Sequence, residues 1–258
     1  MIVRRLSPGP LSAAGAPEAP RIGLVVPATD EVSETAFADM LRDHPVSVVV
    51  SRVAFENPVV MSSLSRMVDD LSRATAALLP GGRIDVVAFS CTSGTVAAGV
   101  DRVARAIEAA KPGVPFTTPI TAAVAAFRRL GVSRIAVLTP YVDEVNQAIH
   151  GFLAAAGLDV VEFGSFHLLT EPEIAGVSPE AIVAAGRSIA VPDAEAVFIS
   201  CTGLRGHAAI AALEATTGRP VVTSNQAQVW EALSLVDYGR PVHGYGQLLA
   251  TLAGARVA

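Results

Sequence analysis

The chain has 258 residues, of which 51% are hydrophobic and 17% charged, and its formal net charge is −5. This length is enough for one large domain or two small ones with a sizeable buried core. The negative charge and the absence of a cluster of Lys and Arg argue against a nucleic-acid partner. No apolar run in the sequence is long enough to span a membrane, so no membrane partner is expected.

Residues 1–20 begin with two arginines after an apolar start and continue as a stretch rich in Ser, Pro, Gly and Ala. Because this stretch has no sustained apolar segment, it is not typical of a secretion signal, and we predict a loose N-terminal tail. Two cysteines without an export signal are typical of a reducing compartment. We therefore expect a cytoplasmic location and free thiols.

Short, apolar, β-branched runs alternate with helical patterns along the chain. The expected strands are 22–27, 46–53, 84–90, 115–118, 134–138, 158–164, 195–200 and 220–223. The expected helices are 31–43, 60–78, 94–110, 121–129, 142–156, 179–190, 204–217 and 226–235. Strands that alternate with helices in this way form parallel sheets with helices on both faces, so an α/β fold is predicted.

The two halves of the chain repeat the same segments in the same order, which indicates an internal duplication. The matched pairs are 21–27 (RIGLVVP) with 134–140 (RIAVLTP), 86–94 (VVAFSCTSG) with 196–203 (AVFISCTG), and 114–119 (VPFTTP) with 219–224 (RPVVTS). We predict two pseudo-symmetric Rossmann-like lobes, each a four-stranded, mainly parallel sheet flanked by helices. Residues 21–120 with 225–258 are assigned to lobe 1 and 121–224 to lobe 2, because the helix after 119 leads directly into the second repeat.

Cys91 and Cys201, the only cysteines of the chain, lie in one of these matched pairs. Each follows a predicted buried strand and precedes a helical pattern, which places each thiol at the carboxyl end of a strand, where open α/β sheets bind ligands. A helix N-terminus favours anions, including a thiolate, so we expect a lowered thiol pKa. The sequence therefore predicts an active site between the lobes, with the two thiols facing each other and the N–H groups of 92–94 and 202–204 cradling a carboxylate.

Two facing thiols can remove a proton from one face of a small acid and return it to the other. A thiolate also adds to an electron-poor double bond. Neither reaction needs a cofactor, and the sequence has no glycine-rich nucleotide motif, so no cofactor is expected. A zinc site built from Cys91, Cys201 and His207 would lack a CxxC or a His pair, so no metal is expected either. The alternative is that both cysteines only pack in the core.

The histidines do not fall at repeated strand ends, so we expect them at the surface or in loops. They are His44, His150, His167, His207 and His243.

The two Cys-Thr segments, with 26–30 (VPATD) and 139–142 (TPYV), resemble the aspartate/glutamate racemase superfamily. The resemblance spans residues 21–250 and is greatest to the branch of maleate cis–trans isomerases, arylmalonate decarboxylases and the ectoine-utilization protein A group. Segment 244–248 (GYGQL) is similar to the decarboxylases, whereas 200–205 (SCTGLR) and 223–227 (TSNQA) are most similar to the ectoine-utilization group.

This resemblance implies roles for several residues. Cys91 matches the nucleophile of maleate isomerases, Cys201 matches the proton donor or acceptor, and Tyr141 matches a tyrosine that binds a substrate carboxylate. The residues implied as backbone cradles are Thr92, Ser93, Thr202 and Gly203. A homodimer or larger homo-oligomer is also implied, as is a small carboxylate substrate.

Two positions depart from the maleate isomerases, which carry asparagine where this chain has Asp30 and, by alignment, close to Glu171. Carboxylates in place of neutral donors repel a dicarboxylate and attract an ammonium group, so we expect a substrate that carries an amino group, as in ectoine-type catabolism. Alternatively, Asp30 only caps the following helix and Glu171 is an exposed loop carboxylate. Thr29 either binds substrate or caps that helix.

The sequence thus predicts a cofactor-independent isomerase or racemase of a small carboxylic acid that uses Cys91 and Cys201. The alternatives are a maleate isomerase proper, an arylmalonate-type decarboxylase with Cys201 as proton donor, and a non-catalytic binding module. Arylmalonate decarboxylases keep only the second-lobe cysteine, so the presence of both favours isomerization or racemization.

Overall fold

The computed structural model describes residues 3–7 and 19–252. Two four-stranded sheets have the orders β2-β1-β3-β4 and β6-β5-β7-β8, and all of their strand pairs are parallel. The first sheet contains β1 (Arg21–Pro27), β2 (Ser47–Val53), β3 (Val86–Phe89) and β4 (Phe116–Thr117). The second contains β5 (Arg134–Thr139), β6 (Asp159–Ser165), β7 (Ala196–Ile199) and β8 (Val221–Thr223). The predicted pair of α/β lobes is confirmed.

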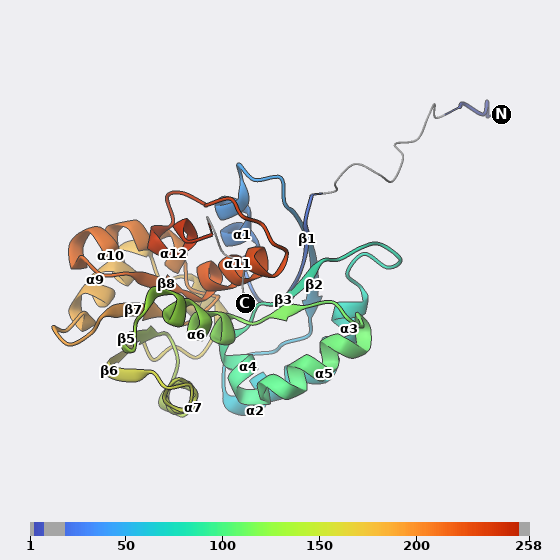
Figure 1. Cartoon of the computed structure of the whole chain (residues 1–258). Coiled ribbons are helices and arrows are strands. Elements are labelled where there is room, and N and C mark those ends of the chain that lie inside the picture. Colours follow the sequence, from blue (N-terminus) through green and yellow to red (C-terminus); the bar gives the residue numbers. More distant parts are fainter. Residues whose placement is uncertain (1–2, 8–18, 253–258) are drawn as a thin grey trace.

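Helices cover these sheets (Figure 1). Those of the first half are α1 (Ser33–Leu41), α2 (Met61–Met67), the 3₁₀ turn η1 (Val68–Asp70), α3 (Leu71–Ala76), α4 (Thr92–Ala98), α5 (Val100–Ala110) and α6 (Pro119–Leu130). Those of the second half are α7 (Asp143–Ala155), α8 (Glu171–Ala175), α9 (Pro179–Ile189), η2 (Gly206–Ala208), α10 (Ile210–Thr217), α11 (Ser224–Leu235) and α12 (Gly246–Ala250). In the described part of the chain, no helix is both long and apolar enough to cross a membrane.

The inner strands β3 and β7 are part of the hydrophobic core of each lobe. Every residue of β3 and β7 is buried, as expected for apolar strands covered by helices on both faces. The edge strands β2 and β6 are partly exposed. A single serine separates each cysteine from β3 or β7, so a fully buried strand of each lobe positions a thiol.

Three of the predicted helices differ from the observed ones, because they are interrupted or begin later in the chain. The helix predicted over 94–110 is two helices, because Gly99 has a φ of 86°, a conformation that ends a helix and suits glycine. The helix predicted over 60–78 contains the 3₁₀ turn η1. The helix predicted over 204–217 begins only at Ile210, after η2. The short helices α8 and α12 were not predicted.

Helices α6 and α11 pack against each other between the two sheets (Figure 1). The Gln228 side chain of α11 donates to the carbonyl oxygens of Phe89, at 3.0 Å, and Thr117, at 3.3 Å. These bonds tie α11 to the first sheet. Most of the tail predicted over 1–20 lies outside the described residues.

Candidate active site

Cys91 is separated from β3 by Ser90 and is the N-cap residue of α4. Its Sγ accepts a hydrogen bond from the backbone N–H of Gly94 at 3.3 Å, and the Ser93 hydroxyl lies 4.0 Å away. The residue is buried, with 5% of its surface exposed. The thiol therefore sits at a helix N-terminus, as the sequence predicted.

Cys201 follows β7 and is buried to the same degree. Its Sγ accepts from the backbone N–H of Gly203 at 3.3 Å. No helix begins at this cysteine, since the chain passes through a turn and η2 before α10. The prediction that a helix N-terminus adjoins the second thiol is therefore wrong, and a single turn N–H replaces it.

Tyr141 lies close to both cysteine loops. It follows β5, is 2% exposed, and the pKa of its hydroxyl is affected by Cys201, by Cys91 and by Ser93, the neighbour of Cys91. Burial raises the pKa of this hydroxyl well above its ordinary value, and the charges of Cys201 and Cys91 raise it further. One phenol therefore lies within the electrostatic influence of both cysteines, which come from different sheets.

Both thiols have a raised pKa, contrary to the prediction from the helix N-terminus. Burial, followed by the negative charge of Glu171, raises the pKa of Cys91 to about 12 and that of Cys201 well above its ordinary value. The N–H groups of Gly94 and Gly203 lower the two values, but by less. The free energy needed to bury a thiolate thus exceeds the stabilisation from one or two hydrogen bonds. Both sulfurs are therefore neutral thiols in the unliganded protein.

Glu171 is the first residue of α8, not an exposed loop carboxylate. A Cβ atom added to Gly203 would lie 2.8 Å from its Oε2 and 3.6 Å from Sγ of Cys201, so the carboxylate points toward the second thiol. Burial, followed by the charges of Asp30 and Glu31, raises its pKa to about 8. Its backbone N–H donates to Oδ1 of Asn57, at 2.9 Å, which fixes α8 to lobe 1.

Asp30 caps the start of α1. Its Oδ1 accepts from the N–H groups of Val32, at 2.9 Å, and Ser33, at 2.7 Å, and its Oδ2 accepts from the Ser33 hydroxyl at 2.7 Å. Asp30 therefore accepts N–H groups at the start of α1, as the alternative predicted, although the N-cap residue of this helix is Val32. Burial still raises the pKa of this carboxyl, and its charge raises the pKa of Cys91 and Glu171, so Asp30 also belongs to the electrostatics of the site.

Thr29 does not share the capping role. Its Oγ1 is buried and has no hydrogen-bond partner in the part of the chain that the structure describes. A buried hydroxyl without a partner is uncommon in proteins.

The side chains of Thr92 and Thr202 hold the two loops together. Oγ1 of Thr92 donates to the Ser224 hydroxyl at 2.9 Å, and Oγ1 of Thr202 to the carbonyl of Ser90 at 3.3 Å. Asn225 donates to the carbonyl of Thr202 at 2.9 Å. Both hydroxyl groups therefore donate to groups of the protein itself.

Ser33, Ser90, Ser224 and Asn225 are buried members of this network that sequence reasoning missed. The Ser90 hydroxyl donates to that of Ser33 at 3.1 Å, and the Ser33 hydroxyl also lies 3.4 Å from Oδ1 of Asn225. Polar residues directly after an apolar strand, at 224 and 225, were the available signal.

His207 corrects the prediction that every histidine is at the surface or in a loop. It lies in η2, is buried, and its Nε2 is 3.7 Å from Oδ2 of Asp39. Burial lowers its pKa. Among residues 3–7 and 19–252, no group of three or more His, Cys, Asp or Glu is arranged to hold a metal ion.

Known proteins resemble the chain over most of its length. A sequence profile of the family described as arylmalonate decarboxylase matches residues 22–249. Arylmalonate decarboxylase of Bordetella bronchiseptica is 35% identical over 139 residues, which are 53% of this chain and 58% of that protein. The chain thus aligns with little more than half the length of that relative. Maleate isomerase of Pseudomonas putida is 26% identical over 245 residues, 89% of this chain and 97% of that protein.

Solved structures have the same fold. The maleate isomerase Iso from Pseudomonas putida S16 has a TM-score of 0.84 at 24% identity, covering 91% of this chain and 99% of its own. A liganded arylmalonate decarboxylase mutant has a TM-score of 0.80 at 30% identity, covering 89% and 98% of the two chains. With the profile match over nearly all of the described residues, this similarity means that the chain belongs to the arylmalonate decarboxylase family.

Proposed function

We propose that the protein is a cofactor-independent isomerase or racemase that uses Cys91 and Cys201 on opposite faces of a small carboxylic acid bearing an amino group. The observation that carries this proposal is that the two cysteine loops meet: Oγ1 of Thr202, next to Cys201, donates to the carbonyl of Ser90, next to Cys91, at 3.3 Å. The pKa of the Tyr141 phenol is raised by both cysteines. One small molecule beside this phenol would lie within reach of both thiols.

A solved structure of a related protein supports a catalytic role for cysteine. A maleate cis–trans isomerase of Nocardia farcinica, 22% identical to this chain, has been solved as a cysteine mutant with a covalently bound succinylcysteine intermediate. The two matched cysteines of this chain are both present and both buried at strand ends. Each of two opposed thiols can serve one face of a planar intermediate.

The acidic surroundings support an amino substrate. The charge of Glu171 raises the pKa of both thiols, and the charge of Asp30 also raises that of Cys91. An ammonium group at these carboxylates would lower the thiol pKa values and so supply the thiolate that the reaction needs. A second substrate carboxylate would raise them further, so the site opposes maleate.

In the proposed racemization, one sulfur acts as a thiolate and the other as a thiol. The thiolate takes the proton from the α-carbon, leaving the electron pair on an enediolate-like intermediate, and the opposite thiol donates its proton to the other face. The charge on the intermediate's oxygens would be stabilised by the N–H groups of 92–94 and 202–204 and by the Tyr141 hydroxyl. The two sulfurs end with exchanged protonation states, and the reverse reaction restores them.

A decarboxylase is the second candidate, favoured by the 35% identity to arylmalonate decarboxylase. Loss of CO₂ leaves the electron pair on an enediolate, which needs one proton donor only. This candidate predicts that Cys91→Ala keeps its activity and Cys201→Ala loses it. The isomerase or racemase loses activity with either substitution, by about 100-fold or more.

The test incubates the protein in D₂O with a panel of small α-amino acids, with maleate and with phenylmalonate, and follows each by proton NMR. We expect deuterium at the α-carbon of an amino acid, and loss of this exchange in Cys91→Ala and in Cys201→Ala. Brisk conversion of maleate to fumarate would refute the amino-substrate proposal, and CO₂ release from phenylmalonate would support the decarboxylase.

A further inference from the structure

Met67, the last residue of α2, lies beside the thiol of Cys91. A Cβ atom added to Gly94 would lie 2.4 Å from Cε of Met67 and 2.8 Å from Sγ of Cys91, so both atoms border the same point. The N–H of Gly94 donates to that sulfur and belongs to the first turn of α4, which is expected to cradle a carboxylate. The methyl group of Met67 therefore covers one side of the Cys91 half-site.

The Cys201 half-site is covered by a different kind of side chain. A Cβ atom added to Gly203, whose N–H donates to Sγ of Cys201, would lie 2.8 Å from Oε2 of Glu171. Glu171 begins α8, the first helix after the edge strand β6, just as α2 is the first helix after the edge strand β2. The two lobes thus use equivalent helices to place an apolar group beside one thiol and a carboxylate beside the other.

Met67 also lines a groove of lobe 1. The groove has a volume of about 190 Å³, and its wall includes Phe55, Ser63 and Met67. Phe55 and Met67 are buried side chains, with 7% and 3% of their surface exposed. Because the same methionine borders both the groove and the thiol of Cys91, its side chain separates these two spaces.

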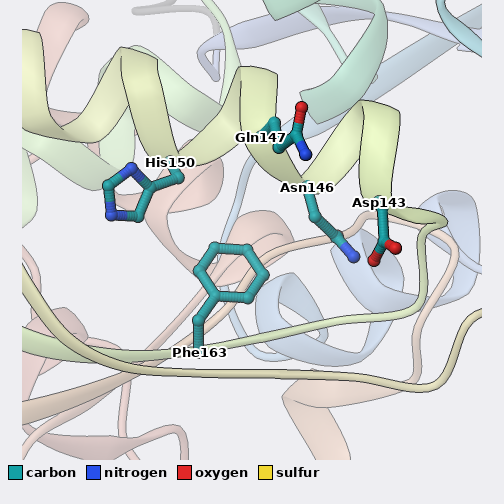
Figure 2. A pocket seen from close by; sticks show the side chains of 5 residues that line it. All are labelled: Asp143, Asn146, Gln147, His150 and Phe163. Atoms are coloured by element: carbon teal, nitrogen blue, oxygen red, sulfur yellow. The ribbon is translucent and has the colours of Figure 1, made fainter.

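A larger groove between α7 and β6 has no such relation to a thiol. It has a volume of about 390 Å³, and Figure 2 shows the side chains that line it, which are Asp143, Asn146, Gln147, His150 and Phe163. The atoms nearest to an added Cβ at positions 94 and 203 belong to other residues. The smaller groove, in contrast, ends at a residue that borders Cys91.

We propose that Met67 is a specificity-determining residue, which restricts the group that the substrate places beside Cys91 to a short and uncharged one. This inference rests on the proposed function, in which the two sulfurs lie on opposite faces of the α-carbon and an ammonium group lies at the carboxylates. The substrate's own side chain then lies at the side of the site that Met67 covers.

The chemistry of this side excludes two kinds of side chain. A methyl group cannot form a hydrogen bond with an acidic or basic group, so a charged side chain would lose its solvation there without compensation. A long side chain would collide with Cε of Met67, behind which the groove lies. The substrate class is therefore an α-amino acid with a short apolar side chain, of the size of alanine or 2-aminobutyrate.

The first experiment alkylates the full chain with 2-bromopropanamide or 2-bromohexanamide, which carry a short or a long alkyl chain on the reacting carbon. The thiolate sulfur forms a bond to this carbon, and the carbon–bromine bond breaks with release of bromide. Rates at pH 9.5 are read at each cysteine by peptide mass spectrometry and divided by the rate with glutathione. After this correction, Cys91 of the wild type should react about 10-fold more slowly with the long amide than with the short one.

Variants of Met67 locate this discrimination. Met67→Ala and Met67→Val should raise the relative rate of the long amide at Cys91 about 10-fold and change it less than about twofold at Cys201. Met67→Leu, which conserves volume, should discriminate as the wild type does. Met40→Ala, which removes a buried methionine of α1, is the matched control for lost packing. Equal rates of the two amides at Cys91 of the wild type would overturn the proposal even if a variant failed to fold.

The second experiment compares alanine, norleucine and aspartate in the deuterium-exchange assay. The wild type should prefer alanine to both, and Met67→Ala should shift kcat/KM toward norleucine by about 10-fold. Faster exchange of aspartate than of alanine by the wild type would overturn the proposal. If no amino acid exchanges, the proposed function fails and the alkylation rates still decide the role of Met67. Unchanged discrimination in Met67→Ala and Met67→Val would refute that role and leave the activity standing.

Discussion

The carboxylate of Glu171 occupies the space that a side chain at Gly203 would need. A Cβ atom at position 203 would lie 2.8 Å from Oε2 of Glu171 and 3.2 Å from Cγ2 of Ile174. The N–H of the same glycine donates to Sγ of Cys201. The absence of a side chain at 203 therefore lets a carboxylate and a thiol approach each other.

The substitution Gly203→Ala tests this relationship. The new methyl group should displace the flexible end of Glu171, so we expect a loss of stability below about 1 kcal/mol but a clear loss of activity. Thermal unfolding and the deuterium-exchange assay measure the two effects. Gly151→Ala, where an added Cβ meets nothing within 4 Å, is the control. Full activity of Gly203→Ala would show that the position of Glu171 is unimportant.

Glu171→Gln should speed the alkylation of both cysteines by iodoacetamide, but only at high pH. Its pKa is raised to about 8, so at pH 9 the carboxylate is charged and raises the thiol pKa values. Removing the charge lowers those values and increases the thiolate fraction. At pH 6.5 the wild-type carboxyl is neutral, and the two proteins should react alike.

The control for this alkylation experiment is Glu180→Gln, which removes a fully exposed carboxylate at the start of α9. Rates at each cysteine are read by mass spectrometry of the peptides. A wild type whose thiols react rapidly at pH 6.5 would contradict the raised thiol pKa values.

Stability should fall as the pH rises through the range in which Glu171 ionises. Folding raises the pKa of this carboxyl from 4.5 to about 8, so the folded state binds more protons between these values. The contribution is complete below pH 4.5 and lost above pH 8. Allowing for partial exposure, we expect about 2 kcal/mol. Urea unfolding at pH 5 and 8.5 measures it, and Glu171→Gln should reduce the difference by about this amount.

Asn225→Ala should destabilise the protein by about 1–3 kcal/mol, because it leaves the buried carbonyl of Thr202 without its donor. The buried contact to the Ser33 hydroxyl is lost as well. The urea midpoint measures the effect, with the exposed amide substitution Gln147→Ala as the comparison. Equal midpoints for the two variants would mean that the network contributes nothing to folding.

The repeated segments made the fold predictable. Apolar strands that recur in the same order, at offsets of 113, 110 and 105 residues, predicted two parallel sheets, and the strand-end position of Cys91 and Cys201 followed from them. The helix boundaries were harder to predict, because the breaks at Gly99 and before Ile210 depend on local backbone geometry. In a single sequence, no strong pattern of residues indicates such breaks.

The thiol pKa values were predicted in the wrong direction. The N–H donors at Gly94 and Gly203 follow from the sequence motif, whereas the depth of burial and the charge of Glu171 depend on how two distant segments pack. Glu171 itself was found only through the resemblance, and its place in α8 depends on Asn57 in the other lobe. Long-range packing of this kind leaves no local pattern.

The central claim is that Cys91 and Cys201 face each other across a single site, and a short thiol-to-thiol cross-linker tests it most directly. Dibromobimane applied at pH 9.5, followed by peptide mass spectrometry, should give one adduct that joins the peptides of Cys91 and Cys201. Cys91→Ser and Cys201→Ser should each give only single attachments. Wild-type protein that carries two separate adducts, with no bridge between the two peptides, would contradict the account.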